Sequence, residues 1–245
     1  ITQRFYNIQP QERLGAVVKL LLHFRPANTI AFCNTKQRCN ALVESLRAQG
    51  ISALALHGDL EQRERDQVLV QFANRSLSVL VATDVAARGL DIEDLAAVIN
   101  VDIAADPAVH VHRIGRTGRA GQSGLAFSLV SMDEMGAVGR IEQAQGIESE
   151  WHKLDALTPQ TKDKLEPPMV TLQITGGRKD KIRAGDLLGA LTADASLTRQ
   201  QVGKISINDF TTYVAIQREL ALSALAKLQA GKVKGRKVKR SEEHT

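Results

Sequence analysis

The sequence has few aromatic residues, only two cysteines and no long hydrophobic run. Phe, Trp and Tyr make up 4% of the 245 residues, so contacts with a nucleic acid would depend mainly on charge and backbone groups. Cys33 and Cys39 are too few for a disulfide framework or a thiolate metal site, and we expect both to be small buried side chains. This suits a reducing cytoplasm, and we expect no metal ligands. No apolar run approaches the ~18 residues of a membrane-spanning helix, and no signal peptide is visible, so no membrane partner is expected.

Both ends of the sequence are unusual. It begins with Ile1 rather than Met, which predicts that more chain precedes it or that the chain was processed. At the other end, an alternation of basic and apolar residues over 232–239 stops abruptly at Arg240. The last six residues, 240–245, correspond to what the start of a common sequencing adapter encodes when translated. We interpret them as a non-native tail and exclude them from functional reasoning.

The charge balance favours a polyanionic partner. The net charge is +5 and the isoelectric point is about 9.3, and a basic surplus of this kind is typical of proteins that bind nucleic acid. A soluble protein with some surplus lysine is the alternative. The 43% hydrophobic content is enough for one large or two modest domains.

The first 153 residues alternate between short apolar runs and longer amphipathic ones. Strands are expected at 29–33, 52–56, 79–82, 97–101 and 125–130, and helices at 36–49, 60–73 (with Asp59 as N-cap) and 133–145 (ending at Gly146). Continuous apolar strands between helices predict a parallel α/β sheet covered on both faces. Polar residues follow these strands, at Asn34-Thr35, His57-Gly58-Asp59, Thr83-Asp84 and Asp102. Function in such sheets sits at the carboxyl ends of the strands.

A second, smaller domain is expected after a linker. Residues 154–168 are polar and contain three prolines, which is typical of a linker. Strands are then expected at 170–175, 204–207, 212–216 and 232–239, with helices at 184–191 and 218–229. The order β-α-β-β-α-β over 169–239 predicts a ferredoxin-like domain.

The segment 112–121 carries the strongest chemical signal. Arg113, Arg116 and Arg119 recur at three-residue spacing, with glycines between and after them. Arginine offers phosphate oxygens a planar fork of donors and stays charged at all relevant pH values. An arginine supplied from outside a phosphate loop stabilises charge on a transferring phosphoryl group. The alternative, an exposed basic turn, explains one arginine but not this ordered set.

Two further segments carry weaker signals. At 81–92 a strand ends at Thr83, whose hydroxyl and neighbouring amides suit a nucleic-acid phosphate, and Asp91 can accept from a ribose hydroxyl. At 57–72, Gly58 permits close backbone approach, while Gln62 and Arg65 share one helix face. The alternatives are a capped strand–helix turn and an ordinary capped helix.

Together these segments resemble the second RecA-like domain of DEAD-box RNA helicases over residues 1–153. Residues 32–36 resemble motif IV, 57–72 the region after it, 81–92 motif V and 112–121 motif VI. The resemblance implies that Arg116 and Arg119 are catalytic arginine fingers. It implies ATP binding by Asp91, Arg113, Arg116 and Arg119, and coupling to the partner domain by His112 and Arg113. It also implies that the RNA backbone is held by Thr35, Gly58, Gln62, Arg65 and Thr83.

Residues 169–239 resemble the RNA recognition motif of DbpA-type DEAD-box helicases, a bacterial group acting on 23S ribosomal RNA. The resemblance is carried by 176–183, 186–190, 202–205, 213–216 and 231–235. Thr171 and Thr211 stand where stacking rings occur in other RNA recognition motifs, so readout by the sheet face is weakened. Tyr213 fits one such stacking position and is also expected to bind RNA. We expect salt-sensitive RNA contacts at Arg178, Lys179, Lys181, Arg183, Lys232 and Lys234. A merely solvated basic face is the alternative.

The resemblance implies an ATP-dependent RNA helicase that assists assembly of the large ribosomal subunit. Its expected partners are a 23S rRNA hairpin of the peptidyl-transferase region, the pre-50S particle and an N-terminal RecA-like domain. The sequence contains no Gly-x-x-x-x-Gly-Lys-[Ser/Thr] and no Asp-Glu-Ala-Asp, so ATP and Mg²⁺ would be held by that other domain and this chain alone would be inactive. The rival readings are a non-enzymatic RNA-binding adaptor and a DNA-directed helicase.

Overall fold

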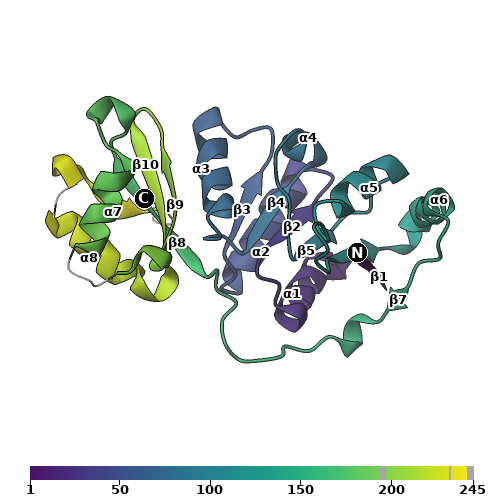
Figure 1. Ribbon diagram of the computed structural model, residues 1–245. Coiled ribbons are helices and arrows are strands. Elements are labelled where there is room, and N and C mark those ends of the chain that lie inside the picture. Colours follow the sequence, from purple (N-terminus) through teal and green to yellow (C-terminus); the bar gives the residue numbers. More distant parts are fainter. Residues whose placement is uncertain (194–196, 232, 242–245) are drawn as a thin grey trace. The chain divides into compact units, whose positions relative to one another are not determined.

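The computed structural model describes residues 1–193, 197–231 and 233–241 of the chain (Figure 1). The chain divides into two compact units. The first comprises Ile1–Arg65 and Ser78–Glu166, and the second comprises Asp66–Leu77 and the chain from Pro167 onward. Each unit is built on its own sheet.

The first unit contains a seven-stranded sheet in which every pairing is parallel, in the order β3-β4-β2-β5-β6-β1-β7. Its strands are β1 (Thr2–Asn7), β2 (Thr29–Phe32), β3 (Ala53–Leu56), β4 (Val79–Ala82), β5 (Ala97–Asn100), β6 (Leu125–Val130) and β7 (Trp151–His152). The five strands expected from apolar runs are confirmed. The sequence pattern did not indicate β1 and β7, because β1 carries polar residues at four of its six positions and β7 has two residues.

The helices that follow these strands are α1 (Arg13–Phe24), α2 (Lys36–Ala48), α3 (Gln62–Ala73), α4 (Asp84–Ala87), α5 (Pro107–Ile114) and α6 (Met135–Gln145). Short 3-10 turns occur at Pro10–Glu12, Met132–Glu134 and Leu154–Ala156. The expected N-cap at Asp59 is wrong. Helix α3 begins at Gln62, and the Asp59 carboxylate instead pairs with Lys36 Nζ at 2.9 Å.

Alternate residues of the parallel strands are buried on opposite faces of the sheet, as the sequence predicted. Tyr6 belongs to a core that includes Leu20 of α1 and Leu42 of α2. The preceding residue, Phe5, belongs to a separate core with Ile141 of α6. Each large side chain of this kind contributes roughly 1.5–3 kcal/mol by its burial. Helices on both faces therefore fix the strands, and the strand ends remain as the edge where polar loops gather.

Both cysteines are buried and unpaired, as expected for small core side chains. A hydrogen bond with Cys39, together with burial, raises the pKa of the Cys33 thiol. Among the residues described by the structure, no helix combines the length and apolar character needed to cross a membrane.

The second unit contains the expected β-α-β-β-α-β domain, with its four strands paired antiparallel in the order β11-β8-β10-β9. Its elements are β8 (Met169–Thr175), α7 (Ala184–Thr192), β9 (Val202–Ile207), β10 (Thr211–Gln217), α8 (Ala221–Gly231) and β11 (Val238–Arg240), with 3-10 turns at Arg178–Asp180, Arg199–Gln201, Arg218–Leu220 and Val233–Gly235. One core joins both helices to the inner face of this sheet, through residues such as Leu172, Leu187 and Leu228.

The expected closing strand over 232–239 is wrong in its bounds. Val233–Gly235 forms a 3-10 turn, and Gly235 has a φ of 74°, which interrupts an extended chain. Strand β11 begins at Val238 and runs one residue further than expected, because Arg240 pairs with Leu172 of β8.

His110, on α5, is a buried histidine that the sequence did not single out. Its side chain is fully enclosed, its Nε2 lies 3.0 Å from Gln3 Oε1, and its Nδ1 has no hydrogen-bond partner. Burial, together with the positive charge of Arg113, lowers the pKa of His110 to about 4. The ring is therefore neutral in the folded protein, with the proton on Nε2 donated to Gln3.

This neutral histidine predicts a loss of stability in mild acid. Between about pH 6.5 and pH 4 the unfolded chain binds a proton at His110 and the folded chain does not, so stability present above that range is lost as the pH falls. From about pH 7.5 to about pH 5 the loss should reach roughly 2 kcal/mol. Urea unfolding of His110→Gln should show a pH dependence smaller by that amount. Val111→Ala, at an exposed side chain on the same helix, should keep the wild-type dependence, and equal dependence in both variants would refute the assignment.

Candidate functional site

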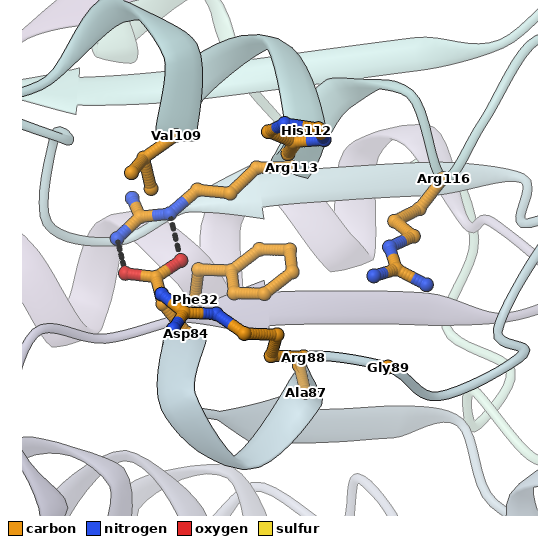
Figure 2. Close-up of a pocket in the computed structure, with 9 residues that line it drawn as sticks. All are labelled: Phe32, Asp84, Ala87, Arg88, Gly89, Val109, His112, Arg113 and Arg116. Atoms are coloured by element: carbon orange, nitrogen blue, oxygen red, sulfur yellow. Dashed lines mark hydrogen bonds and ion pairs between the residues drawn. The ribbon is translucent and has the colours of Figure 1, made fainter.

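A pocket of about 370 Å³ lies at the carboxyl-terminal edge of the parallel sheet, between α4 and α5 (Figure 2). Arg113 of α5 and Arg116 of the glycine-rich segment after α5 line one side of the pocket, and α4 lines the other side. The residues that line it are Phe32, Asp84, Ala87, Arg88, Gly89, Val109, His112, Arg113 and Arg116.

Arg113 is the structural centre of this pocket. Its guanidinium is buried and forms two 2.7 Å hydrogen bonds to the Asp84 carboxylate (Figure 2). It also donates to the Asp102 carbonyl oxygen at 2.7 Å and to Asn34 Oδ1 at 3.0 Å. The guanidinium carbon lies 5.2 Å from the centre of the Phe32 ring. One side chain thus connects the ends of β2, β4 and β5.

The donors of Arg113 are directed at protein groups in this arrangement. A buried guanidinium is tolerated only when its charge and its N–H groups are matched, and the bidentate carboxylate supplies both. Arg113 therefore organises the pocket wall, and its direct contact with ATP stays a prediction. His112, beside it, has an exposed side chain that lines the pocket.

Arg116 and Arg119 lie on the loop after α5 and contact the loop that follows α4. Arg116 Nη1 donates to the carbonyl oxygens of Leu90 at 2.6 Å and Ile92 at 3.3 Å. Arg119 is exposed and forms an ion pair with the exposed Glu93. The two arginines expected as fingers therefore bracket Asp91, the residue expected at the ribose.

Hydrogen bonds that do not involve the arginine side chains join these two loops. The amide of Leu95 donates to the Arg116 carbonyl oxygen at 3.1 Å, and the Thr117 hydroxyl donates to the Leu95 carbonyl oxygen. Gly118 has a φ of 69°, a conformation that favours glycine, and it lies between Arg116 and Arg119. The loop geometry thus fixes the spacing of the expected ATP-binding set.

The expected RNA-binding residues of this unit gather at the ends of β2, β3 and β4, which are adjacent in the sheet. Thr35 caps α2, accepting from the Arg38 amide at 3.1 Å, and Thr83 caps α4, accepting from the Ala86 amide at 3.4 Å. Gly58 is exposed, and a Cβ there would meet nothing within 4 Å. The backbone at Gly58 is therefore open to approach.

Gln62 and Arg65 lie in the first turn of α3. Arg65 donates through Nη2 to the Ala86 carbonyl oxygen of α4 at 3.3 Å, whereas Gln62 is exposed. Helix α4 therefore contacts both expected sets, through Ala86 on the RNA side and through Asp84 on the Arg113 side. The structure brings each set together, and it joins the two through one helical turn.

Arg13 is a buried residue of this edge that motif-based reasoning missed. Its guanidinium donates to the Val101 carbonyl oxygen at 2.6 Å and to the Glu134 carboxylate at 2.9 Å, and lies 3.6 Å from Asp102. A signal was present in the sequence, because Arg13 recurs at helical spacing with the buried residues of α1, namely Ala16, Val17, Leu20 and Leu21.

In the second unit, Arg178, Lys179, Lys181 and Arg183 are all exposed on the segment between β8 and α7. Tyr213 of β10 is instead 5% exposed and Thr171 of β8 is fully buried, so neither presents an open surface. Lys232 lies outside the described residues, and so does the side chain of Lys234. RNA contacts by this whole set stay a prediction. Within the described ranges, no cluster of His, Cys, Asp and Glu side chains has the arrangement of a metal site.

Two family models match separate parts of this chain. Residues 12–121 match the helicase conserved C-terminal domain family, and residues 171–241 match the DbpA RNA binding domain family. The chain is 47% identical over 239 residues to the ATP-dependent RNA helicase DbpA of Escherichia coli, covering 96% of this chain and 51% of that protein. It is 32% identical over 253 residues to the DbpA helicase of Bacillus subtilis, covering 95% of this chain and 53% of that protein.

A solved structure of a DEAD-box protein is similar to part of this chain. The E. coli DEAD-box protein SrmB, in a structure with regulator of ribonuclease activity A, superposes with a TM-score of 0.60 and 33% sequence identity, covering 67% of this chain and 97% of that one. The chain spans about half the length of the curated DbpA relatives it matches.

The buried arginine predicts a large difference between two carboxylate substitutions. Asp84→Ala leaves the guanidinium of Arg113, which is 2% exposed, without its counter-charge, and should lower the free energy of unfolding by about 3–5 kcal/mol. Glu93→Ala removes the partner of Arg119 from an exposed pair and should cost no more than about 1 kcal/mol. Urea unfolding at neutral pH measures both. Similar small losses would mean that Arg113 does not depend on Asp84.

Proposed function

The chain belongs to the DEAD-box RNA helicases of the DbpA type, and from that premise we propose that it is the C-terminal part of an ATP-dependent RNA helicase. The observation that carries the proposal is the grouping of Arg116, Arg119 and Asp91 on two mutually fastened loops. The adjacent strand ends carry Thr35 and Thr83. One edge of the sheet thus carries the residues proposed to bind the ATP phosphates beside those proposed to bind RNA.

The proposed nucleotide contacts fit the chemistry of these side chains. Arg116 and Arg119 offer guanidinium donors to the phosphate oxygens of ATP, and Asp91 offers an acceptor to a ribose hydroxyl. ATP, with Mg²⁺ held by an N-terminal RecA-like domain, supplies the phosphoryl group whose transfer drives the motor. The role of the two arginines is to stabilise the charge that spreads over that group as its bond to the leaving oxygen lengthens.

The finger arginines reach a nucleotide by exchanging partners. Arg119 pairs with Glu93 where both side chains are exposed, and such pairs contribute at most about 1 kcal/mol. Exchanging the Glu93 carboxylate for an ATP phosphate therefore costs little free energy. Arg116 remains anchored near Leu90 and Ile92 until the two RecA-like domains close. Closure on ATP would deliver both arginines together, because they share one loop.

Coupling between RNA and nucleotide is proposed to run through α4. This four-residue helix is capped by Thr83, accepts from Arg65 at Ala86, and holds Arg113 through Asp84. RNA phosphates bound by Thr83 and Arg65 would shift one end of α4. Arg113 and His112 would transmit that shift to the residues proposed to bind ATP. Thr35, Gly58 and Gln62 would extend the RNA contact along the strand ends.

The finer proposal concerns the RNA itself. By resemblance to DbpA-type helicases, the small domain would bind a 23S rRNA hairpin of the peptidyl-transferase region in a pre-50S particle, in the cytoplasm. The four exposed basic residues between β8 and α7 support a phosphate-led, salt-sensitive interaction. Anchored there, the motor would unwind nearby duplex and assist assembly of the large subunit.

Arg119→Ala in the full-length protein should reduce RNA-stimulated ATP turnover by roughly 10³–10⁵-fold, because the transition state loses a finger guanidinium. RNA affinity should be nearly unchanged, since the residue lies apart from the RNA set. Arg140→Ala, an exposed arginine of α6, is the matched control and should retain full turnover. Unchanged turnover in Arg119→Ala would exclude the finger role.

The chain of residues 1–245 alone should bind RNA without hydrolysing ATP, because its sequence contains no phosphate loop. The comparison is steady-state phosphate release by this chain and by the full-length protein, each with and without RNA. Turnover by residues 1–245 would contradict the two-domain site. RNA binding without turnover by the full-length protein would instead favour the alternative hypothesis, a non-enzymatic RNA-binding adaptor.

A further inference from the structure

The turn between β9 and β10 presents an aromatic ring that neither RNA-binding set includes. Phe210 is 64% exposed, in a chain with only nine aromatic residues, and it directly precedes β10. Lys179 Nζ lies over its ring, 4.7 Å from the ring centre. The ring thus has one face covered by a cation and a large surface open to solvent.

Two loops are locked together to hold this ring. The amide of Arg178 donates to the Asn208 carbonyl oxygen at 2.8 Å, and the amide of Lys179 donates to the Asp209 carbonyl oxygen at 3.1 Å. Gly177 is required for this approach, because a Cβ there would lie 2.0 Å from the Asn208 oxygen. The position of Phe210 relative to Lys179 is therefore set by the backbone, so little ordering is needed when a ligand binds.

The charges around the ring are predominantly positive. Residues 178–183, residues 208–210 and Arg236 together carry five basic and two acidic side chains. Both acidic groups are already paired, Asp209 with Arg178 at 3.4 Å and Asp180 with Arg236. A negatively charged ligand is therefore favoured at the same place as the exposed ring.

We propose that Phe210 and the loop 178–183 form a stacking site for an unpaired RNA base, with the adjacent phosphates held by the basic side chains. The inference deepens the proposed function and rests on RNA being the ligand of the small domain. An exposed ring beside cations is the arrangement by which proteins hold single-stranded nucleic acid. A single ring surrounded by charged groups lacks the contiguous apolar area that docking of a folded protein would need.

The test compares two RNA probes with the chain of residues 1–245. One is a hairpin with a fluorescent adenine analogue in its unpaired loop, and the other is a blunt duplex of similar composition. Phe210→Ala should weaken hairpin binding by roughly 5- to 150-fold, the range for loss of one base–aromatic stack. Duplex affinity should not change. The fluorescence of the analogue should be quenched on binding to the wild type and recover with the variant.

Matched variants separate stacking from other effects. Phe210→Trp should retain hairpin affinity and quenching, and Phe210→Leu should lose both, because leucine keeps apolar area without an aromatic face. Leu222→Ala, at a side chain of α8 that is 69% exposed, should behave as the wild type. Since Phe210 is exposed, all variants should unfold at the same urea concentration.

Three outcomes would overturn the site. Hairpin affinity that is equal in Phe210→Ala and the wild type would show that no base stacks there. Full affinity in Phe210→Leu would show an apolar contact instead of stacking. Failure of the wild-type chain to bind either RNA would remove the proposed function as well. The first two outcomes, with RNA still bound, leave the helicase proposal intact.

Discussion

The arrangement of the large domain's polar edge depends on one buried positive charge. A buried Arg113 needs a counter-charge, because leaving a buried ion unpaired costs about 3–5 kcal/mol, a large share of the net stability of a domain. The Asp84 carboxylate supplies that charge and the Asp102 carbonyl oxygen supplies a further acceptor. Meeting this one requirement fixes where β4, β5 and α5 end relative to one another, and therefore where the loop that carries Arg116 and Arg119 begins.

A second buried arginine shares the same junction. Arg13 contacts the Asp102 carboxylate, while Arg113 binds the carbonyl oxygen of the same residue. The other carboxylate oxygen accepts from the Asn34 amide at 2.9 Å. Two guanidinium groups from helices far apart in sequence thus converge on the residue that follows β5. The sheet's hydrophobic faces hold the strands, and these polar contacts hold the loops that the strands carry.

The sequence predicted what depends on local pattern and missed what depends on distant partners. The strands at β4 and β6 were predicted with their observed bounds, because each is a short apolar run between turn residues. Strand β1 was missed, since its mostly polar sequence becomes a strand only through pairing with β6 and β7. Arg116 and Arg119 were singled out through their spacing, and their role as fingers stays a prediction. The partner of Arg113 was not, because nothing in the local pattern near Asp84 indicates a guanidinium 29 residues away. Phe210 was overlooked because a single ring in a turn has no periodicity.

Helix α4 consists of only four residues, Asp84–Ala87. A helix of one turn has no stability of its own, because nucleation costs more than its few hydrogen bonds return. It exists because Thr83 caps it and arginines hold it at Asp84 and Ala86. The turn therefore forms or melts as a single event. Its amide protons should exchange with solvent together. Any substitution that weakens the arginine contact at one end of α4 would also weaken the contact at its other end. If the two proposed sites bind their ligands, such a segment would make both binding events act on one shared, all-or-none local transition.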